Sequence, residues 1–322
     1  MIVFLSKRLV HSLFVLLLVV FCSYSLMGLM PGDPIDLMAI GNPDLTPADI
    51  ARMKAQLGLD QPILVRFWNW LVNGLHGDFG YSRFYHLPAI DVILPAAWNT
   101  IKLVGLATIL SILIAVPVGV FAALRPKSWI DYTIGFLSFV GFSTPAFFLA
   151  LMLMLLFSVH LGWLPAGGSG EADGEGFWFR AKYMILPVLA LTILSVASVS
   201  RYVRSSMLEV MRQDYIRTAK AKGASNRYVV WKHAIKNAMI PVVTIIALDF
   251  GTLLSGAVLT ESVFAWPGMG KVLLDSLAGS DYNVALLCII VITINMLLGN
   301  LLADVAYTKL DPRIDLNKGA SA

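Results

Sequence analysis

The chain has 322 residues, of which 58% are hydrophobic and only 14% are charged, and its mean hydropathy is +0.77. Soluble domains carry about 25% charged residues, so this composition excludes an ordinary soluble protein. The formal net charge is +4, and the two cysteines, Cys22 and Cys288, lie in apolar runs far from any metal-ligand spacing. The sequence therefore predicts an all-α integral membrane protein with neither a disulfide framework nor a metal site.

The N-terminal 30 residues begin like a signal peptide, with Lys7 and Arg8 before an apolar run. That run is too long for a signal peptide, and no A-x-A cleavage site follows it, so we expect a retained first span. We expect three parts: residues 1–30 as the tail and first span, residues 31–99 as an external region with short helices, and residues 100–322 as a five-span core.

Six runs are long and apolar enough to cross a hydrocarbon core of about 30 Å. They cover residues 9–30, 100–124, 132–160, 183–203, 240–260 and 284–307. Three prolines within or at the start of spans, Pro117, Pro145 and Pro187, predict kinks. With the N-terminus in the cytoplasm, 16 of the 24 Lys and Arg residues lie on the cytoplasmic side. The positive-inside rule therefore predicts that both termini are cytoplasmic.

Two external segments follow different patterns. The stretch Thr46-Pro47-Ala48-Asp49 is typical of a helix start, and Gly58 is expected to end that helix. In residues 63–75, Phe67, Trp68, Trp70 and Leu71 are expected near the membrane surface, either as an interfacial anchor or as a docking surface for a partner. The other loop, residues 162–182, contains AGGSGEADGEG and is predicted to be flexible.

Residues 204–239, the coupling segment below, form the largest cytoplasmic stretch. A helix is predicted from Arg204 to Lys222, and Gly223 is suited to end it in a left-handed conformation. Ser225 can cap a second helix, and Pro241 lies at the entry of the fifth span. In that helix one apolar face is expected to contain Tyr228, Trp231, Ile235 and Met239.

Nine cationic residues between Arg201 and Lys236 allow two interpretations of this segment. They obey the positive-inside rule and contact anionic lipid, at about 1 kcal/mol each. Alternatively, small residues leave a low surface that fits the groove of a partner protein. These small residues are Ala219, Ala221, Gly223 and Ala224.

The coupling segment resembles the cytoplasmic loop of binding-protein-dependent ABC importer permeases, whose pattern is Glu-Ala-Ala, three residues, Gly, and a stretch ending in Leu-Pro. Ala219 takes the second alanine, Gly223 the glycine, and Ile240-Pro241 the final pair. Arg217 and Thr218 replace the first two residues, and the form DYIRTAKAKG is similar to the peptide-importer branch. Other stretches similar to that branch are MPGDP (30–34), LGLDQP (57–62), HGDFGYS (76–82), RSSMLEV (204–210) and LTESVFAWPGMGK (259–271).

The resemblance implies six spans with a cytoplasmic coupling helix between spans four and five, in a bacterial inner membrane. It implies contact with an ATPase through Arg217, Thr218, Ala219, Lys220, Gly223, Ala224 and Ser225, supported by Tyr228, Trp231, Ile235 and Pro241. The partners it implies are two cytoplasmic ABC ATPases, a second, paralogous permease and an external or periplasmic binding protein; no nucleic acid is expected.

No G-x-x-x-x-G-K-[ST] phosphate loop occurs in the sequence, since Gly270-Lys271 is followed by Val272. We therefore expect no catalytic residue and no cofactor on this chain, with ATP and Mg bound by the partner subunits.

Asp249 is the one carboxylate well inside a predicted span, where a charge costs at least about 2.5 to 3.5 kcal/mol. We expect it to face the translocation path or to pair with a neighbouring permease. Glu261 and Asn295 are further candidates for the path, although Asn295 equally suits a helix-to-helix hydrogen bond. The stretch WPGMGK after Glu261 is either a turn that closes the path or an interfacial loop held by Trp266.

The leading hypothesis is an importer of short peptides, and the same architecture for nickel chelates or oligosaccharides is its alternative. An ion-coupled secondary transporter predicts paired intramembrane charges and inverted repeats, for which Asp249 alone is thin support. A membrane enzyme needs a catalytic constellation, yet the five histidines are scattered and no HExxH, GxSxG or carboxylate pair occurs.

Overall fold

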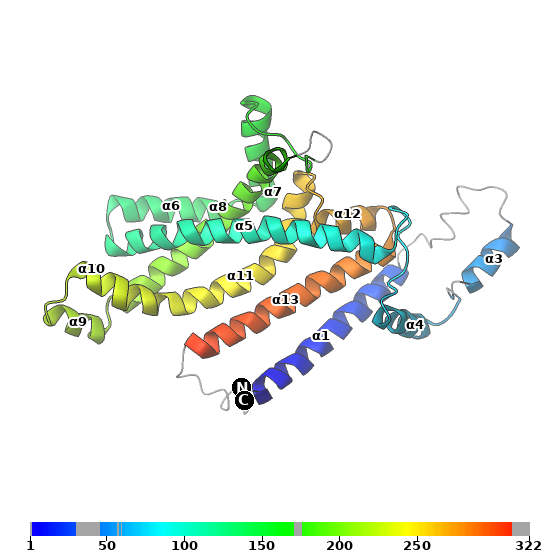
Figure 1. The fold of residues 1–322 in the computed structure, drawn as a ribbon, viewed down its shortest axis with the longest axis horizontal. Helices are drawn as coiled ribbons and strands as arrows, with labels where there is room; N and C mark the ends of the chain where they lie inside the picture. The colour runs from blue at the N-terminus through cyan, green and yellow to red at the C-terminus, as the bar shows by residue number, and fades with distance from the viewer. Residues whose placement is uncertain (1, 30–45, 57, 59, 171–175, 311–322) are drawn as a thin grey trace. The chain divides into compact units, whose positions relative to one another are not determined.

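The computed structural model describes residues 2–29, 46–56, 58, 60–170 and 176–310. Within these ranges the protein is helical and contains no strand, only an isolated bridge between Tyr81 and Pro88 (Figure 1). Among the described residues, five helices are long and apolar enough to cross a membrane, or six if one strongly bent pair counts as a span. The all-α membrane fold expected from the sequence is confirmed.

The helices before the coupling segment are α1 (Ile2–Leu29), α3 (Pro47–Gln56), α4 (Ile63–Leu75), α5 (Ala89–Leu124), α6 (Trp129–Ser143), α7 (Ala146–Leu153), a π-helix (Met154–His160) and α8 (Phe177–Val210). Those from the coupling segment onward are α9 (Asp214–Ala221), α10 (Asn226–Tyr228), a second π-helix (Val229–Ala234), α11 (Ile235–Val263), α12 (Met269–Ala278) and α13 (Tyr282–Leu310). Two compact units divide the chain: residues 2–98 with 268–294, and residues 99–267 with the segment from 295 onward.

In the unit formed by residues 2–98 and 268–294, the predicted start of α3 is confirmed. The Thr46 hydroxyl donates to the Asp49 carboxylate at 2.6 Å, and the Asp49 amide donates to the Thr46 hydroxyl oxygen at 3.3 Å. The bond from Thr46 holds the pKa of Asp49 below its ordinary value. Gly58 has the left-handed φ of 64° expected of a residue that ends a helix.

The aromatic residues of α4 divide between the interior and the surface of the same unit. Phe67 packs edge-on against Phe21 of α1, with ring centroids 5.1 Å apart, and Trp70 lies against Tyr24 at 5.8 Å. Trp68 is 63% exposed. Two of the four residues expected at the membrane surface therefore hold α4 on α1, and Trp68 remains available to lipid or a partner.

In the unit formed by residues 99–267 and 295 onward, α8 packs against both α6 and α11 (Figure 1). Small residues bring these backbones close together. A Cβ atom at Gly119 of α5 would lie 2.6 Å from the Ser200 carbonyl oxygen, and one at Gly141 of α6 would lie 2.7 Å from the Ala197 Cβ. Apolar residues of α5, α8, α9 and α11 fill the space between these helices; they include Ala115, Val199, Val203, Met207, Ile216 and Ala238.

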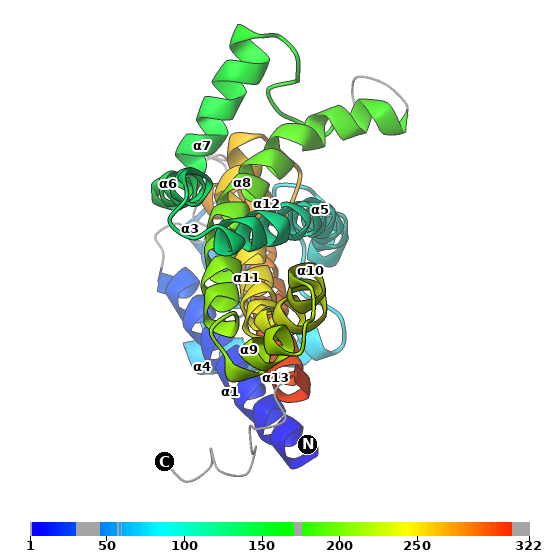
Figure 2. The same cartoon turned by 90° about the vertical axis from the view of Figure 1, so that its left-hand side faces the viewer.

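The third predicted span, residues 132–160, is not a straight helix. It breaks at Thr144-Pro145, where both residues are extended, and the two halves are bent by 104° (Figure 2). The kink predicted at Pro145 is present, but it is far sharper than an ordinary proline kink. Proline removes one backbone donor and disfavours helical conformation at the residue before it, and the two effects together end α6 at Ser143.

The loop between the bent pair and α8 makes backbone contacts in its described part, and the flexibility predicted for residues 162–182 stays a prediction. The Gly168 amide donates to the Phe264 carbonyl at 2.8 Å, and a Cβ at Gly167 would lie 2.4 Å from that oxygen. Helix α8 then begins at Phe177, earlier than the predicted Tyr183. Residues 171–175 lie outside the described part of the chain.

Candidate functional site

The coupling segment consists of two helices, but the first begins later than expected. The predicted helix from Arg204 to Lys222 is wrong because α8 ends at Val210 and a turn at Met211–Gln213 precedes α9. Nothing in that turn is a helix breaker by composition. The turn is explained by Ile216, which is fully buried in the cluster with Val203 and Met207. If α8 continued straight, Ile216 would lie on the face turned away from those two residues.

The glycine break is confirmed in detail. Gly223 has a φ of 83°, its amide donates to the Lys220 carbonyl at 3.0 Å, and the Ala224 amide donates to the Ala219 carbonyl at 3.2 Å. These two bonds form the Schellman arrangement that ends a helix at a left-handed residue. A Cβ atom at Gly223 would meet nothing within 4 Å, so the chain itself needs glycine there for its backbone conformation and not for space.

Ser225 begins the next helix as predicted. Its hydroxyl oxygen accepts from the Tyr228 amide at 3.3 Å, which satisfies one of the free donors at the start of α10. The turn from α9 into α10 is thus closed on both sides by local hydrogen bonds, and it is a defined corner of the backbone.

Only half of the apolar face expected for the second helix is turned inward. Ile235 and Met239 pack against the cluster, but Tyr228 is 46% and Trp231 is 68% exposed. The buried residues are instead Val229, Val230, Ala234 and Ala238. The cause is the π-helix at Val229–Ala234, whose wider turns shift the inward-facing positions away from a 3.6-residue period.

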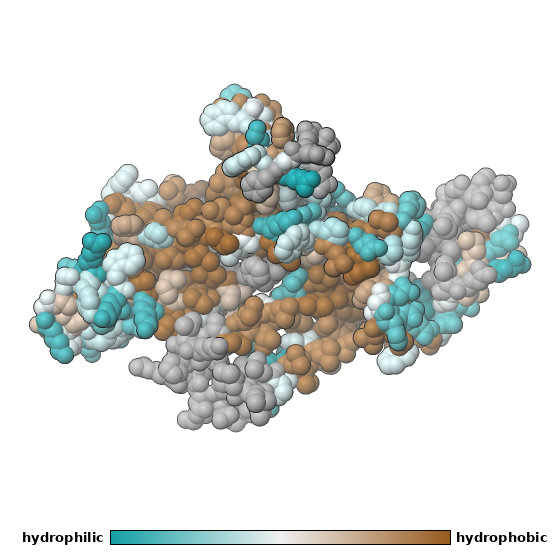
Figure 3. Space-filling model, viewed as in Figure 1, coloured by the Kyte–Doolittle hydropathy of each residue, from teal (hydrophilic) through white to brown (hydrophobic). Residues whose placement is uncertain are grey.

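The turn from α9 to α10, residues 222–225, is called the glycine corner below. Beside it, Tyr228 and Trp231 form a shallow groove with Ser225 and Arg227. The Tyr228 ring is covered by Lys232, whose Nζ lies 4.9 Å from the ring centroid, and by the His233 ring at 5.6 Å. Hydrophilic residues gather at this end of the molecule over α9 and α10, next to the apolar surface of the spans (Figure 3).

The residues assigned to ATPase contact lie on the exposed side of this corner. Arg217, Thr218, Lys220, Gly223 and Ser225 are exposed. Ala219 and Ala224 are half-buried and pack against the cluster, so their small size serves the interior of this chain as well as its surface.

Pro241, predicted at the entry of the fifth span, lies inside α11, which runs from Ile235 to Val263. The ring removes a backbone donor inside the helix. The donor lost at Pro241 would have served the Asn237 carbonyl; the Ser206 hydroxyl of α8 donates to the next carbonyl, that of Ala238, at 2.7 Å and joins α8 to α11 there.

The three residues proposed for the translocation path have different environments. The backbone of Asp249 lies in α11, but its side chain is outside the described part of the structure. Glu261 lies inside α11; it is fully buried and accepts a hydrogen bond from the Thr100 hydroxyl at 2.6 Å. Asn295 is half-buried in α13. Their roles in the path stay predictions.

The stretch after Glu261 is a turn followed by a helix. Trp266 is only 4% exposed, and its indole donates to the Asn99 carbonyl at 3.3 Å, while the Asn99 side chain donates to the Pro267 carbonyl at 3.0 Å. The alternative of an interfacial loop held by an exposed tryptophan is therefore wrong. Gly268 then begins α12, which contains Lys271.

Comparison with known proteins identifies the family. Residues 115–316 match the model of the binding-protein-dependent transport system inner membrane component, and residues 1–89 match the model of its N-terminal part. The chain belongs to this family. It is therefore a multi-pass membrane permease of a transport system.

Curated relatives of the permease match it over almost its whole length. The oligopeptide transport system permease protein AppB of Bacillus subtilis (strain 168) is 38% identical over 314 residues, which cover 97% of this chain and 99% of the relative. The glutathione transport system permease protein GsiC of Salmonella choleraesuis (strain SC-B67) is 39% identical over 97% of this chain and 98% of the relative. The dipeptide transport system permease protein DppB of Alkalihalophilus pseudofirmus is 37% identical over 98% of this chain and 99% of the relative.

The fold is also found in solved transporters. A structure of the MetNI methionine ABC transporter, in an inward-facing conformation, has a TM-score of 0.56 and 19% sequence identity, covering 69% of the permease and 97% of that chain. At this identity the likeness shows a common fold and nothing about substrate.

Proposed function

We propose that the permease forms one half of the translocation path of an ATP-driven importer of short peptides, which an external binding protein delivers. The observation that carries this proposal is the full-length similarity to relatives named for oligopeptide, dipeptide and glutathione transport. A second, paralogous permease supplies the other half. Asp249 and Asn295 are proposed to face the path between them.

The glycine corner is the proposed contact with two cytoplasmic ATPase subunits, which bind ATP and Mg. Its exposed residues and its groove support the assignment, because a protein partner needs an accessible and defined surface. The burial of Ile216 supports it further. A switching mechanism needs an element that moves as a body, and α9 is held to α8 and α11 by that side chain.

The permease is proposed to lie in a bacterial cytoplasmic membrane with both termini and the coupling segment in the cytoplasm. The cationic residues concentrated in the short loops support this orientation, since positive charge is retained on the cytoplasmic side.

The first experiment is to tag the C-terminus, purify the chain gently from its native membrane, and identify by mass spectrometry every protein that copurifies. Two ATPases and a second permease are expected. A chain that purifies alone would contradict the importer and favour an ion-driven transporter.

The substrate is then tested in proteoliposomes that contain the purified complex, with the proposed external binding protein added outside. ATP-dependent uptake of labelled di- to pentapeptides is expected. Uptake of a nickel chelate or an oligosaccharide without peptide uptake would contradict the substrate and leave the architecture intact.

A further inference from the structure

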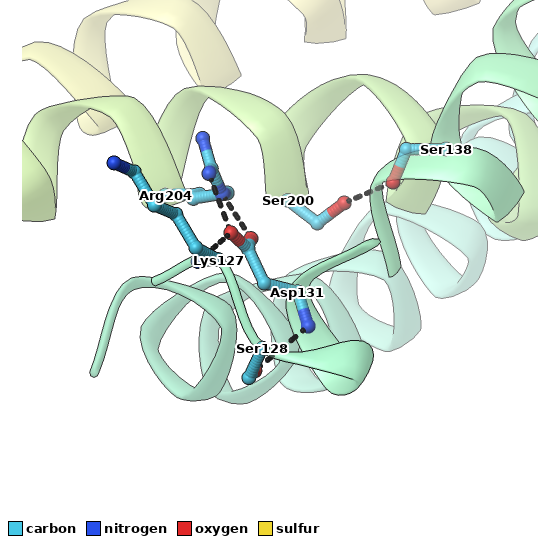
Figure 4. Close-up of polar contacts among 6 residues, drawn as sticks. All are labelled: Lys127, Ser128, Asp131, Ser138, Ser200 and Arg204. Atoms are coloured by element: carbon cyan, nitrogen blue, oxygen red, sulfur yellow. Dashed lines mark hydrogen bonds and ion pairs between the residues drawn. The ribbon is translucent and has the colours of Figure 1, made fainter. Parts of the chain in front are cut away.

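A partly buried ion pair joins the first turn of α6 to the C-terminal part of α8 (Figure 4). The Arg204 guanidinium donates to both oxygens of the Asp131 carboxylate, from Nε at 2.5 Å and from Nη2 at 2.8 Å. The Asp131 side chain is 4% exposed and that of Arg204 is 34% exposed. A two-point, charge-assisted contact of this kind fixes the orientation of both groups as well as the distance between them.

Asp131 also holds the turn between α5 and α6. Its carboxylate accepts from the Lys127 amide at 3.0 Å, and its own amide donates to the Ser128 hydroxyl oxygen at 3.3 Å (Figure 4). Lys127 has a left-handed φ of 61°, which a residue with a side chain rarely adopts. One carboxylate therefore connects the turn after α5, the first turn of α6 and the C-terminal part of α8.

The contact between α6 and α8 continues beyond the ion pair. The Ser138 and Ser200 hydroxyls lie 3.1 Å apart, and the Arg201 guanidinium lies 4.7 Å from the centroid of the Phe142 ring. Gly141 allows the two backbones to approach. Helix α6 is thus attached to α8 at its first turn, its middle and its end, immediately before the 104° bend at Pro145.

The face of α8 next to Arg204 contacts the coupling segment. Val203 and Met207 pack in the same cluster as Ile216 of α9 and Val230 of the π-helix. Ser206 donates to the Ala238 carbonyl at 2.7 Å. Helix α8 therefore contacts the coupling segment through Val203, Ser206 and Met207 and contacts α6 through Arg204.

We propose that Asp131 and Arg204 are a positioning pair that makes α6 and the α5–α6 turn move together with α8 and the coupling segment. Breaking this contact during the transport cycle would leave a carboxylate buried without its charge partner, which is strongly unfavourable. A displacement of the glycine corner is therefore transmitted through α8 to the bent third span. The inference rests on the proposed function, because it concerns how ATPase movement reaches the membrane spans.

The test uses the purified complex in proteoliposomes and compares the wild type with Asp131→Asn, Arg204→Gln and the double variant. The number of peptides imported per ATP hydrolysed is measured for equal amounts of assembled complex. We expect that ratio to fall about tenfold in each single variant, which is a typical magnitude for a coupling free energy. The double variant is expected to be no worse than either single one, because both remove the same contact.

Asp275→Asn is the matched control, because it removes the carboxylate of an ion pair with Lys271 that lies within the single helix α12. It is expected to leave the ratio unchanged. A merely structural role for Asp131 and Arg204 predicts fewer assembled complexes with a wild-type ratio, and that result would overturn the inference. A wild type without ATP-driven peptide uptake would overturn the proposed function instead.

A second measurement leaves the ion pair intact. Spin labels are placed at Tyr132 of α6 and at Lys222 after α9, both exposed, in a chain whose two cysteines are replaced by alanine. A label pair on the copurified ATPases reports their closure on ATP. We expect the mean distance between the labels at Tyr132 and Lys222 to stay constant on closure in the wild type. In Asp131→Asn we expect the distribution of that distance to broaden. A distance that changes in the wild type would show that α6 does not move with the coupling segment.

Discussion

At the scale of single residues, a glycine can be required for its backbone conformation or because a side chain would not fit, and at Gly223 only the first reason holds within the chain. Its left-handed backbone, at a φ of 83°, explains why a side chain is unfavourable, since that conformation costs other residues about 1 to 2 kcal/mol. The open space around it within the chain gives no second reason. Asparagine tolerates the left-handed conformation better than other residues, so it tests whether a partner comes close.

We expect Gly223→Asn to assemble normally but to lower ATP-driven peptide uptake about tenfold, a factor that corresponds to about 1.4 kcal/mol of lost contact. The reason is that the added side chain would project into the space where the ATPase is proposed to dock. Uptake and recovery of the complex are measured together. Gly58→Asn is the matched control, because Gly58 also ends a helix with a left-handed φ, of 64°, outside the coupling segment. Normal uptake by Gly223→Asn would mean that no partner approaches this residue.

The residues that sequence analysis placed correctly are those whose partners lie within a few positions. Gly223, Ser225 and the Thr46–Asp49 pair all complete hydrogen bonds to neighbouring backbone or side chains, so their patterns are visible in the sequence. Asp131 and Arg204 were missed. A Ser-x-x-Asp capping pattern marks the start of α6, but nothing in the sequence pairs Asp131 with a residue in another helix.

At the scale of helices, the division of the coupling segment depends on one buried side chain. Local helix propensity predicted a single helix through residues 211–213, and the structure breaks it so that Ile216 reaches the cluster with Val203 and Met207. The π-helix at Val229–Ala234 shifts the inward face in a similar way. Tertiary packing decides both features, and local propensity therefore located the segment but not its internal geometry.

Ile216→Ala is expected to release α9 from α8. Removing a fully buried isoleucine costs about 2 to 5 kcal/mol, which increases the population of the detached helix by more than about tenfold. Trypsin applied to inside-out membrane vesicles should then cleave faster at Arg212 and Arg217. Tyr215→Ala, on the same helix but 42% exposed, should leave the cleavage rate unchanged. Equal rates for both variants would show that Ile216 does not hold the segment in place.

At the scale of the whole molecule, the number of membrane crossings depends on the bent pair of α6 and α7. Helix α6 has 15 residues, about 22 Å at 1.5 Å per residue, which is too short for a hydrocarbon core of about 30 Å. If α6 and α7 with the π-helix cross together, the spans number six and both termini lie on one side. If the pair returns to the side it entered from, the spans number five and the termini lie on opposite sides.

We expect the pair to cross. No charged residue interrupts the sequence between Asp131 and His160, and the cationic Arg125 and Lys127 precede it, as the positive-inside rule requires of a cytoplasmic turn.

Single cysteines at Arg125, Trp163 and Arg212, all exposed, are introduced into the chain without its own cysteines. A membrane-impermeant maleimide added to intact cells should label only the cysteine at position 163. Added to inside-out vesicles, it should label the other two. Labelling of positions 125 and 163 from the same side, with position 212 labelled from the other side, would mean that the bent pair is re-entrant. The termini would then face opposite sides, and α6, still attached to α8 through Asp131 and Arg204, would end inside the membrane.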